Sequence, residues 1–276
     1  MTARQVWVNG AVCDENDARV SPFDHGLLTG DGVFETVRAY AGRPFALDRH
    51  LARLKASADG LGLEVPDFDL LRSAVREVLA ANELGEARVR ITVTGGRSPL
   101  GSVRGADGPL VIVAAAAHAD YEPDVSVAIA PWPKSEHSAV AGLKTTSYAE
   151  NVVALAWARE RGAGEAIFTN LAGNVCEGTG TNLFVVLEGR LATPPLSAGC
   201  LAGVTRALIV EELKVEESDF PPEALAEATE AFLSSTTREV HPIRSVDGRE
   251  LPECPGPETL RAAAAVRALV EAEIAG

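Results

Sequence analysis

The chain has no excess of positive charge. Its 276 residues include 25 lysines and arginines against 39 aspartates and glutamates, for a formal net charge of −14. A surface this acidic argues against nucleic acid or an anionic membrane as a partner. No run of 18 apolar residues occurs either, so no segment is expected to span a membrane. A small anionic ligand remains compatible, because it needs only a local positive site.

Cysteine is also scarce, and its spacing excludes several classes of site. The four cysteines, Cys13, Cys176, Cys200 and Cys254, show neither metal-finger nor redox-pair spacing. They are expected to be reduced thiols in a cytoplasmic protein, with Cys176 buried by packing. The five histidines show no metal-ligand spacing, so we expect no metal site. The first residues do not resemble a signal peptide.

The remaining composition, 46% hydrophobic and 23% charged, is that of an ordinary globular protein. Apolar periodicity predicts both strands and helices. The chain turns polar around residues 118–123, which separates two groups of elements. We therefore expect a smaller amino-terminal α/β domain over 1–118, a linker over 119–123 and a larger domain over 124–276. Strands are expected at 5–9, 11–13, 33–40, 88–94, 110–117, 124–130, 165–169, 182–187 and 230–235. Helices are expected at 48–60, with Asp48 as its cap, and at 66–84, 149–161, 203–213 and 259–274.

One stretch organises the chain and begins at Glu177, a carboxylate before a glycine-rich turn. Gly178 and Gly180 are expected to let the backbone turn where a Cβ would clash. Residues 182–187 are apolar and β-branched, which predicts a buried strand. The run from Gly203 then opens a helix, whose free amide groups form a ready anion site. Taken alone, such a residue is more often a solvated loop acid, because most glutamates are exposed.

The whole stretch resembles the signature of the class IV aminotransferases, which are fold-type IV pyridoxal-phosphate (PLP) enzymes. That signature reads acid, small residue, Asn, apolar, aromatic, then apolar-x-Thr, then apolar-x-Gly-apolar-x-basic. The matching residues are Glu177, Thr179, Asn182, Leu183, Phe184, Leu191, Thr193, Leu201, Gly203, Val204 and Arg206. The resemblance implies a two-domain α+β or α/β fold whose larger domain holds a mixed sheet or barrel.

A PLP site needs a lysine amine, an acid near the pyridine nitrogen and donors for the phosphate. Only four lysines are present, and Lys144 lies between an apolar segment and a helix start, 33 residues before Glu177 as in the family. The resemblance therefore assigns the cofactor-bearing amine to Lys144 and the pyridine partner to Glu177. Lys134, in a proline-rich loop, is the alternative lysine.

The resemblance also indicates the other cofactor contacts. The pattern His50-Leu-Ala-Arg53-Leu looks like the segment whose arginine binds the phosphate, a role that suits a bidentate guanidinium. Tyr148 is a candidate for the ring oxygen, although packing at a helix start would explain it equally well. The remaining candidate cofactor residues are Asn182, Val204, Thr205, Ser235 and Thr236.

The loop and strand around residues 30–38 decide the reaction within the family. They look like the lyase and D-amino acid branches, and Gly95 stands where the D-amino acid enzymes carry an arginine. We therefore expect a 4-amino-4-deoxychorismate lyase, which expels pyruvate to leave 4-aminobenzoate for folate synthesis. The alternatives are a transaminase of branched-chain or D-amino acids with a 2-oxo acid acceptor, and a PLP-binding protein without turnover.

The substrate is expected to be a small amine or amino-acid-like molecule, and the resemblance implies a homodimer. Strand alternation places Phe34, Thr36 and Arg38 on one face, which makes them candidate substrate contacts. Arg97 and Thr237 complete the candidate set, although surface salt bridges would account for both arginines as well.

Overall fold

A computed structural model describes residues 4–276 of the chain. Contacts between Cα atoms divide it into two compact units. The first unit comprises residues up to Ala119 together with Leu143–Tyr148 and Glu273–Gly276, and the second comprises Asp120–Gly142 and Ala149–Ala272. The two short segments of the first unit fall within the range 124–276 that was expected for the second domain.

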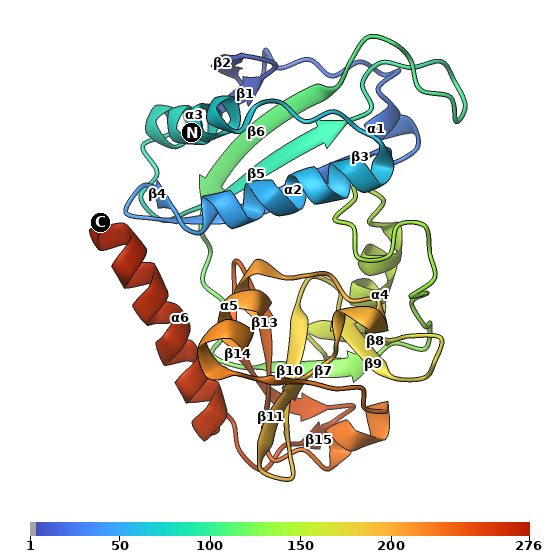
Figure 1. Cartoon of the computed structure of the whole chain (residues 1–276), viewed down its shortest axis with the longest axis vertical. Helices are drawn as coiled ribbons and strands as arrows, with labels where there is room; N and C mark the ends of the chain where they lie inside the picture. Colours follow the sequence, from blue (N-terminus) through green and yellow to red (C-terminus); the bar gives the residue numbers. More distant parts are fainter. Residues whose placement is uncertain (1–3) are drawn as a thin grey trace. The chain divides into compact units, whose positions relative to one another are not determined.

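The first unit is built on a six-stranded antiparallel sheet in the order β2-β1-β6-β5-β3-β4. Its strands are β1 (Gln5–Val8), β2 (Ala11–Asp14), β3 (Gly32–Tyr40), β4 (Arg43–Pro44), β5 (Ala87–Thr94) and β6 (Leu110–Ala117). Helices α2 (Leu47–Leu61) and α3 (Phe68–Ala81) lie across one face of this sheet, as Figure 1 shows. Val33 and Val37 of β3 join the core beneath these helices. Phe34, Thr36 and Arg38 therefore lie on the opposite face, as the alternation predicts.

Two helix starts in the first unit differ from expectation. Asp48 was expected to cap the helix, but α2 begins at Leu47 and its N-cap is Ala46, with φ of 52° and no side-chain cap. Asp48 instead lies in the first turn, where a carboxylate still complements the helix dipole. A further short helix, α1 (His25–Leu28), occupies a stretch that was expected to be a loop, and Asp24 caps it by accepting a hydrogen bond from the Gly26 amide.

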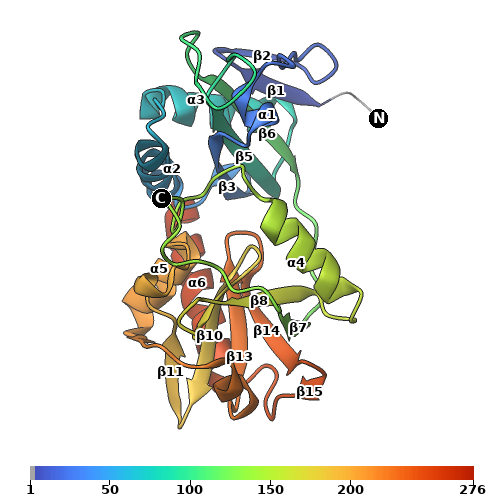
Figure 2. The same cartoon turned by 90° about the vertical axis from the view of Figure 1, so that its right-hand side faces the viewer.

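The second unit holds a nine-stranded mixed sheet in the order β12-β11-β10-β13-β14-β7-β8-β9, with β15 paired to β14. Parallel pairs join β7 to β8 and to β14, while β10 and β13 pair antiparallel. Figure 2 shows this sheet curling, with α4, α5 and α6 around the strands. The expected mixed sheet is confirmed. Its elements are β7 (Val125–Ile129), α4 (Ala149–Arg159), β8 (Glu165–Thr169), β9 (Val175–Gly178), β10 (Asn182–Leu187), β11 (Arg190–Thr193), α5 (Val204–Leu213), β12 (Glu216–Glu217), β13 (Ala231–Ser235), β14 (Glu239–Val246), β15 (Arg249–Glu250) and α6 (Pro257–Ala275).

The structure confirms the expected Cβ clash at one of the two glycines in the turn after Glu177. A Cβ on Gly178 would clash with the Thr181 hydroxyl, so the absence of a side chain there is required. A Cβ on Gly180 would meet nothing within 4 Å, and its φ is not positive, so the expected clash at Gly180 is wrong. Cys176 is buried and all four cysteines are free, as expected. Among residues 4–276, no helix has the length and apolar character needed to cross a membrane.

Candidate active site

Lys144 is held in the first unit between β3 and α2. Its backbone carbonyl accepts a hydrogen bond from the Phe34 amide at 3.0 Å, and its own amide donates to the Ser57 hydroxyl at 3.1 Å. These two contacts fix the lysine backbone on both sides. The Lys144 amine lies 4.4 Å from the centre of the Phe34 ring and 6.0 Å from that of Tyr148. The structure thus brings together Lys144, Phe34 and Tyr148, three residues singled out from the sequence.

Arg90 of β5 joins this group, and the sequence analysis did not identify it. Its guanidinium carbon lies 3.7 Å from the centre of the Phe34 ring, which also meets the Tyr148 ring edge-on at 5.3 Å. Arg90 pairs in register with Thr36 on β3. Strand alternation carried across to residues 88–94 would have placed Arg90 on the same face as Phe34, so a usable signal was present.

Arg53, the candidate phosphate ligand, makes a bidentate ion pair with Glu35. Its Nε and Nη2 atoms donate to the two Glu35 carboxylate oxygens at 2.7 and 2.8 Å, and His50 Nδ1 lies 2.7 Å from the same carboxylate. Burial would raise the pKa of Glu35, but the hydrogen bonds and charge of Arg53 together with His50 lower it to about 2. Burial is also the main cause that lowers the pKa of His50, so its imidazole is neutral and donates from Nδ1. Arg53 is therefore fixed in orientation by a residue that sequence reasoning had assigned no role.

Glu177 of β9 is the centre of a second group, which lies in the second unit. It is 6% exposed, and both of its carboxylate oxygens are engaged. Oε1 accepts a hydrogen bond from the Lys134 ammonium at 2.6 Å, and Oε2 accepts from the Leu201 amide at 2.8 Å. The solvated-loop interpretation of Glu177 is therefore wrong, since the carboxylate is buried and held by two donors.

The start of α5 has the properties of an anion site. Gly203 is its N-cap and makes no side-chain cap hydrogen bond, and the amides of Val204 and Thr205 are among the first helix donors, which have no partner within the helix. Asn182 braces the approach by donating to the Leu201 carbonyl at 2.9 Å, and a Cβ on Gly203 would clash with the Asn182 carboxamide. This uncapped helix start with the Thr205 hydroxyl fits a phosphate group.

The turn after β13 contains the other candidate phosphate donors. Ser235 accepts a hydrogen bond from the Arg238 amide at 3.1 Å, and the Thr237 hydroxyl pairs with the Tyr121 hydroxyl at 3.0 Å. Arg238 stacks on the Tyr121 ring at 5.1 Å and reaches Glu165 at 3.4 Å. The turn is therefore a structured element tied to Tyr121, and Thr237 in particular is already engaged.

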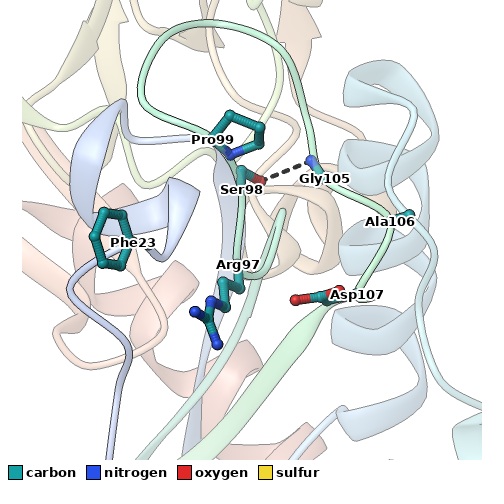
Figure 3. A pocket seen from close by; sticks show the side chains of 7 residues that line it. All are labelled: Phe23, Arg97, Ser98, Pro99, Gly105, Ala106 and Asp107. Atoms are coloured by element: carbon teal, nitrogen blue, oxygen red, sulfur yellow. Dashed lines mark hydrogen bonds between the residues drawn. The ribbon is translucent and has the colours of Figure 1, made fainter.

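The two arginines proposed for the substrate make other contacts in the first unit. Arg38 forms a salt bridge with Glu86 at 3.4 Å and stacks over the Tyr40 ring at 4.5 Å. Arg97 lines a pocket of about 310 Å³, where Figure 3 shows it near Phe23 and Asp107. Arg90 is the arginine that stacks on the Phe34 ring.

Comparison with known proteins identifies the family. The family model for class IV amino-transferases matches residues 32–246. A D-alanine aminotransferase of Listeria innocua is 32% identical over 266 residues, 88% of this chain and 88% of that protein. The crystal structure of Escherichia coli branched-chain amino acid aminotransferase, 32% identical, has a TM-score of 0.91 over 97% of this chain and 95% of that one. A T.th. branched-chain amino acid aminotransferase complexed with N-(5'-phosphopyridoxyl)-L-glutamate, 28% identical, has a TM-score of 0.88 over 99% of this chain and 94% of that one.

These relatives are aminotransferases, so they fit the transaminase alternative better than the lyase reaction expected from residues 30–38 and Gly95. The family model covers well over half of the chain, including the stretch from Glu177 to Arg206 that carries the resemblance. The chain therefore belongs to the class IV aminotransferases and is an enzyme that uses pyridoxal phosphate.

Proposed function

We propose that the chain is an amino-acid transaminase that acts on branched-chain amino acids and passes the amino group to a 2-oxo acid. The observation that carries this proposal is the set of side chains around the Lys144 amine. Two aromatic rings, Phe34 and Tyr148, stand beside it, and the Arg90 guanidinium stacks on the first of them. Aromatic rings suit an aliphatic side chain, and a guanidinium suits the carboxylate of an amino acid or 2-oxo acid.

Each candidate residue has a role in this proposal. When bound, pyridoxal phosphate withdraws electrons from the amine-bearing carbon of the substrate. Lys144 would hold the cofactor through its side-chain amine, and the same amine would carry the proton of the substrate carbon. Glu177 would accept a hydrogen bond from the pyridine nitrogen. The phosphate is assigned to Val204, Thr205, Ser235, Thr236 and Arg53.

The reactions of the family separate in one assay series. The purified protein with pyridoxal phosphate is given L-leucine or D-alanine with 2-oxoglutarate, and separately 4-amino-4-deoxychorismate alone. We expect L-leucine to yield 4-methyl-2-oxopentanoate and glutamate only when 2-oxoglutarate is present. If D-alanine reacts with 2-oxoglutarate and L-leucine does not, the result would assign the D-amino acid reaction instead. Release of pyruvate and 4-aminobenzoate without any acceptor would overturn the transaminase proposal in favour of the lyase.

Replacing Lys144 tests its assignment directly. We expect Lys144→Ala to lower the transfer rate on the order of 10²–10⁴-fold, because both the covalent attachment and the proton carrier are lost. Borohydride reduction of the wild type followed by peptide mapping should place the cofactor on Lys144. The matched control is Lys55→Ala, since Lys55 is an exposed residue paired with Asp59. A cofactor mapped to Lys134 would contradict the assignment.

Three further properties belong to the same proposal: a homodimer, a cytoplasmic location, and a division into domains over 1–118 and 124–276. The family resemblance supports the dimer. Sedimentation equilibrium of the purified protein would test it, and a monomer throughout the micromolar range would contradict it.

A further inference from the structure

Lys134 is placed in the second unit by its backbone. Its amide donates to the carbonyl of Thr169, the last residue of β8, at 2.7 Å, and it forms an isolated bridge with Asn170. Glu177 on the neighbouring strand β9 pairs in register with Phe168 of β8. The Lys134 side chain thus extends over the Phe168 ring and reaches Glu177, with its Nζ atom 5.7 Å from the centre of the ring.

The segment that delivers this ammonium is stiff. Pro131 and Pro133 fix the backbone on either side of Trp132, and the Trp132 ring packs edge-on against Trp157 of α4 at 6.0 Å. The Lys134 side chain is 25% exposed and that of Glu177 is 8% exposed. The ion pair is therefore largely withdrawn from water, where each charge depends on its partner for compensation.

The Glu177 carboxylate retains capacity for another donor. Ionised carboxylate oxygens offer about four lone-pair sites, and the hydrogen bonds from Lys134 and Leu201 occupy two of them. The Lys134 amine is thus engaged with Glu177 in the second unit, whereas the Lys144 amine stands beside the Phe34 and Tyr148 rings in the first unit. This separates the roles of the two lysines that the sequence left as alternatives.

We propose that Lys134 is a positioning residue whose ammonium holds the Glu177 carboxylate in the orientation that the pyridine nitrogen of the cofactor would need, an inference that rests on the role of Glu177 in the proposed function. Lys134 acts through Glu177 and has no covalent part in the reaction. With the cofactor bound, Lys134 and the ring N–H would share one carboxylate, so the charge of Lys134 would influence how strongly the ring nitrogen holds its proton.

The first test is cofactor binding to the cofactor-free protein, with no substrate present. We expect Lys134→Met to weaken pyridoxal phosphate binding about tenfold or more, the effect of losing a hydrogen bond to a charged group. Lys134→Arg should restore binding to near the wild-type level, and Lys55→Met should leave it unchanged. In the double variant Lys134→Met/Glu177→Gln, binding should equal that of Glu177→Gln alone, because the lysine acts only through the carboxylate.

The second test is the absorbance of the bound cofactor as a function of pH. The midpoint of the spectral change should shift in Lys134→Met and return in Lys134→Arg, a response that a purely structural role would not produce. Should Lys134→Met fail to fold, Lys134→Gln keeps an uncharged donor at the same place and is expected to fold and still bind weakly.

Three results would overturn the proposal. The first is a loss of cofactor affinity in the double variant that equals the sum of the losses in the two single variants. The second is a Lys134→Met protein with wild-type cofactor affinity and an unchanged pH profile. The third is attachment of the cofactor to Lys134 after borohydride reduction. None of these measurements depends on which substrate is transformed. These tests therefore distinguish a failure of the transaminase proposal from a failure of this inference.

Discussion

At the scale of single residues, Glu35 shows how one buried carboxylate organises its neighbours. Its side chain is fully buried, and Arg53 and His50 together supply the hydrogen bonds that keep it ionised. A buried charge is tolerated only with such partners, and removing one partner leaves the others uncompensated. Glu35 therefore supports the position of Arg53 on α2.

The contacts of Glu35 predict how the free energy of unfolding depends on pH in the acid range. The pKa of Glu35 falls from 4.5 to about 2 on folding, so its contribution of about 3 kcal/mol is complete above pH 4.5 and disappears as the pH falls through 2. We expect Glu35→Gln to lower the free energy of unfolding by about 3–5 kcal/mol at neutral pH. Urea titrations at several pH values measure both effects.

The control for this prediction is Glu86→Gln, because Glu86 is a largely exposed partner of Arg38 and should contribute less than about 1 kcal/mol. A Glu35→Gln protein as stable as the wild type at pH 7 would contradict the assigned role. So would a wild-type acid dependence between pH 4.5 and 2 that the substitution leaves unchanged.

At the scale of elements, the loop between β5 and β6 is held to α1 by His25. Its Nδ1 lies 2.9 Å from an Asp31 carboxylate oxygen and its Nε2 lies 2.8 Å from the Gly101 carbonyl. Both partners are acceptors, so both ring nitrogens donate and the ring is an imidazolium. Arg104 binds Asp31 through two hydrogen bonds of 2.6 Å from the same loop. These residues border a pocket of about 350 Å³.

The loop is therefore expected to loosen as the pH rises. The hydrogen bond to Asp31 is the main cause that raises the pKa of His25 above 6.5, and the bond to Gly101 adds to it. The stabilisation is complete below 6.5 and is lost as the pH passes the raised pKa. Hydrogen exchange of the amides in 101–105, corrected for intrinsic pH dependence, should show protection falling across that range.

A His25→Gln variant supplies the comparison, since glutamine keeps one donor and does not titrate near neutral pH. Its loop should exchange faster than the wild type below pH 6.5 and show no corresponding pH step. Arg104 remains charged throughout, so it holds Asp31 equally in both proteins. An identical pH step in both proteins would show that another group is responsible.

At the scale of the whole molecule, the cofactor is expected to contribute substantially to stability. A ligand that binds only the folded state adds about 2.7 kcal/mol at a concentration one hundred times its dissociation constant. For a chain of this size, that corresponds to a rise of roughly 5–10 °C in the unfolding midpoint. Calorimetry of the protein before and after removal of pyridoxal phosphate measures the shift, and equal midpoints would contradict cofactor binding by the folded chain.

The elements themselves were largely predictable, because their signals are local. Alternating side chains identified the strand at 33–40, and the structure places β3 at Gly32–Tyr40. The helix opening after Gly203 was also predicted, and α5 begins at Val204. Starts without a local signal were missed, as with Ala46, whose left-handed conformation at the cap of α2 no sequence rule favours in an alanine.

The amino-acid sequence alone determined the strands and helices and the family, since periodicity and the motif from Glu177 to Arg206 lie within short stretches of chain. Only the tertiary structure decided the partners of the charged groups. Lys134 meets Glu177 across 43 residues and Arg53 meets Glu35 across 18. The pairing of β8 with β9 sets the first distance, and the packing of α2 on β3 sets the second. Burial then determines which charges need a partner, and burial is a property of the packed chain rather than of any segment.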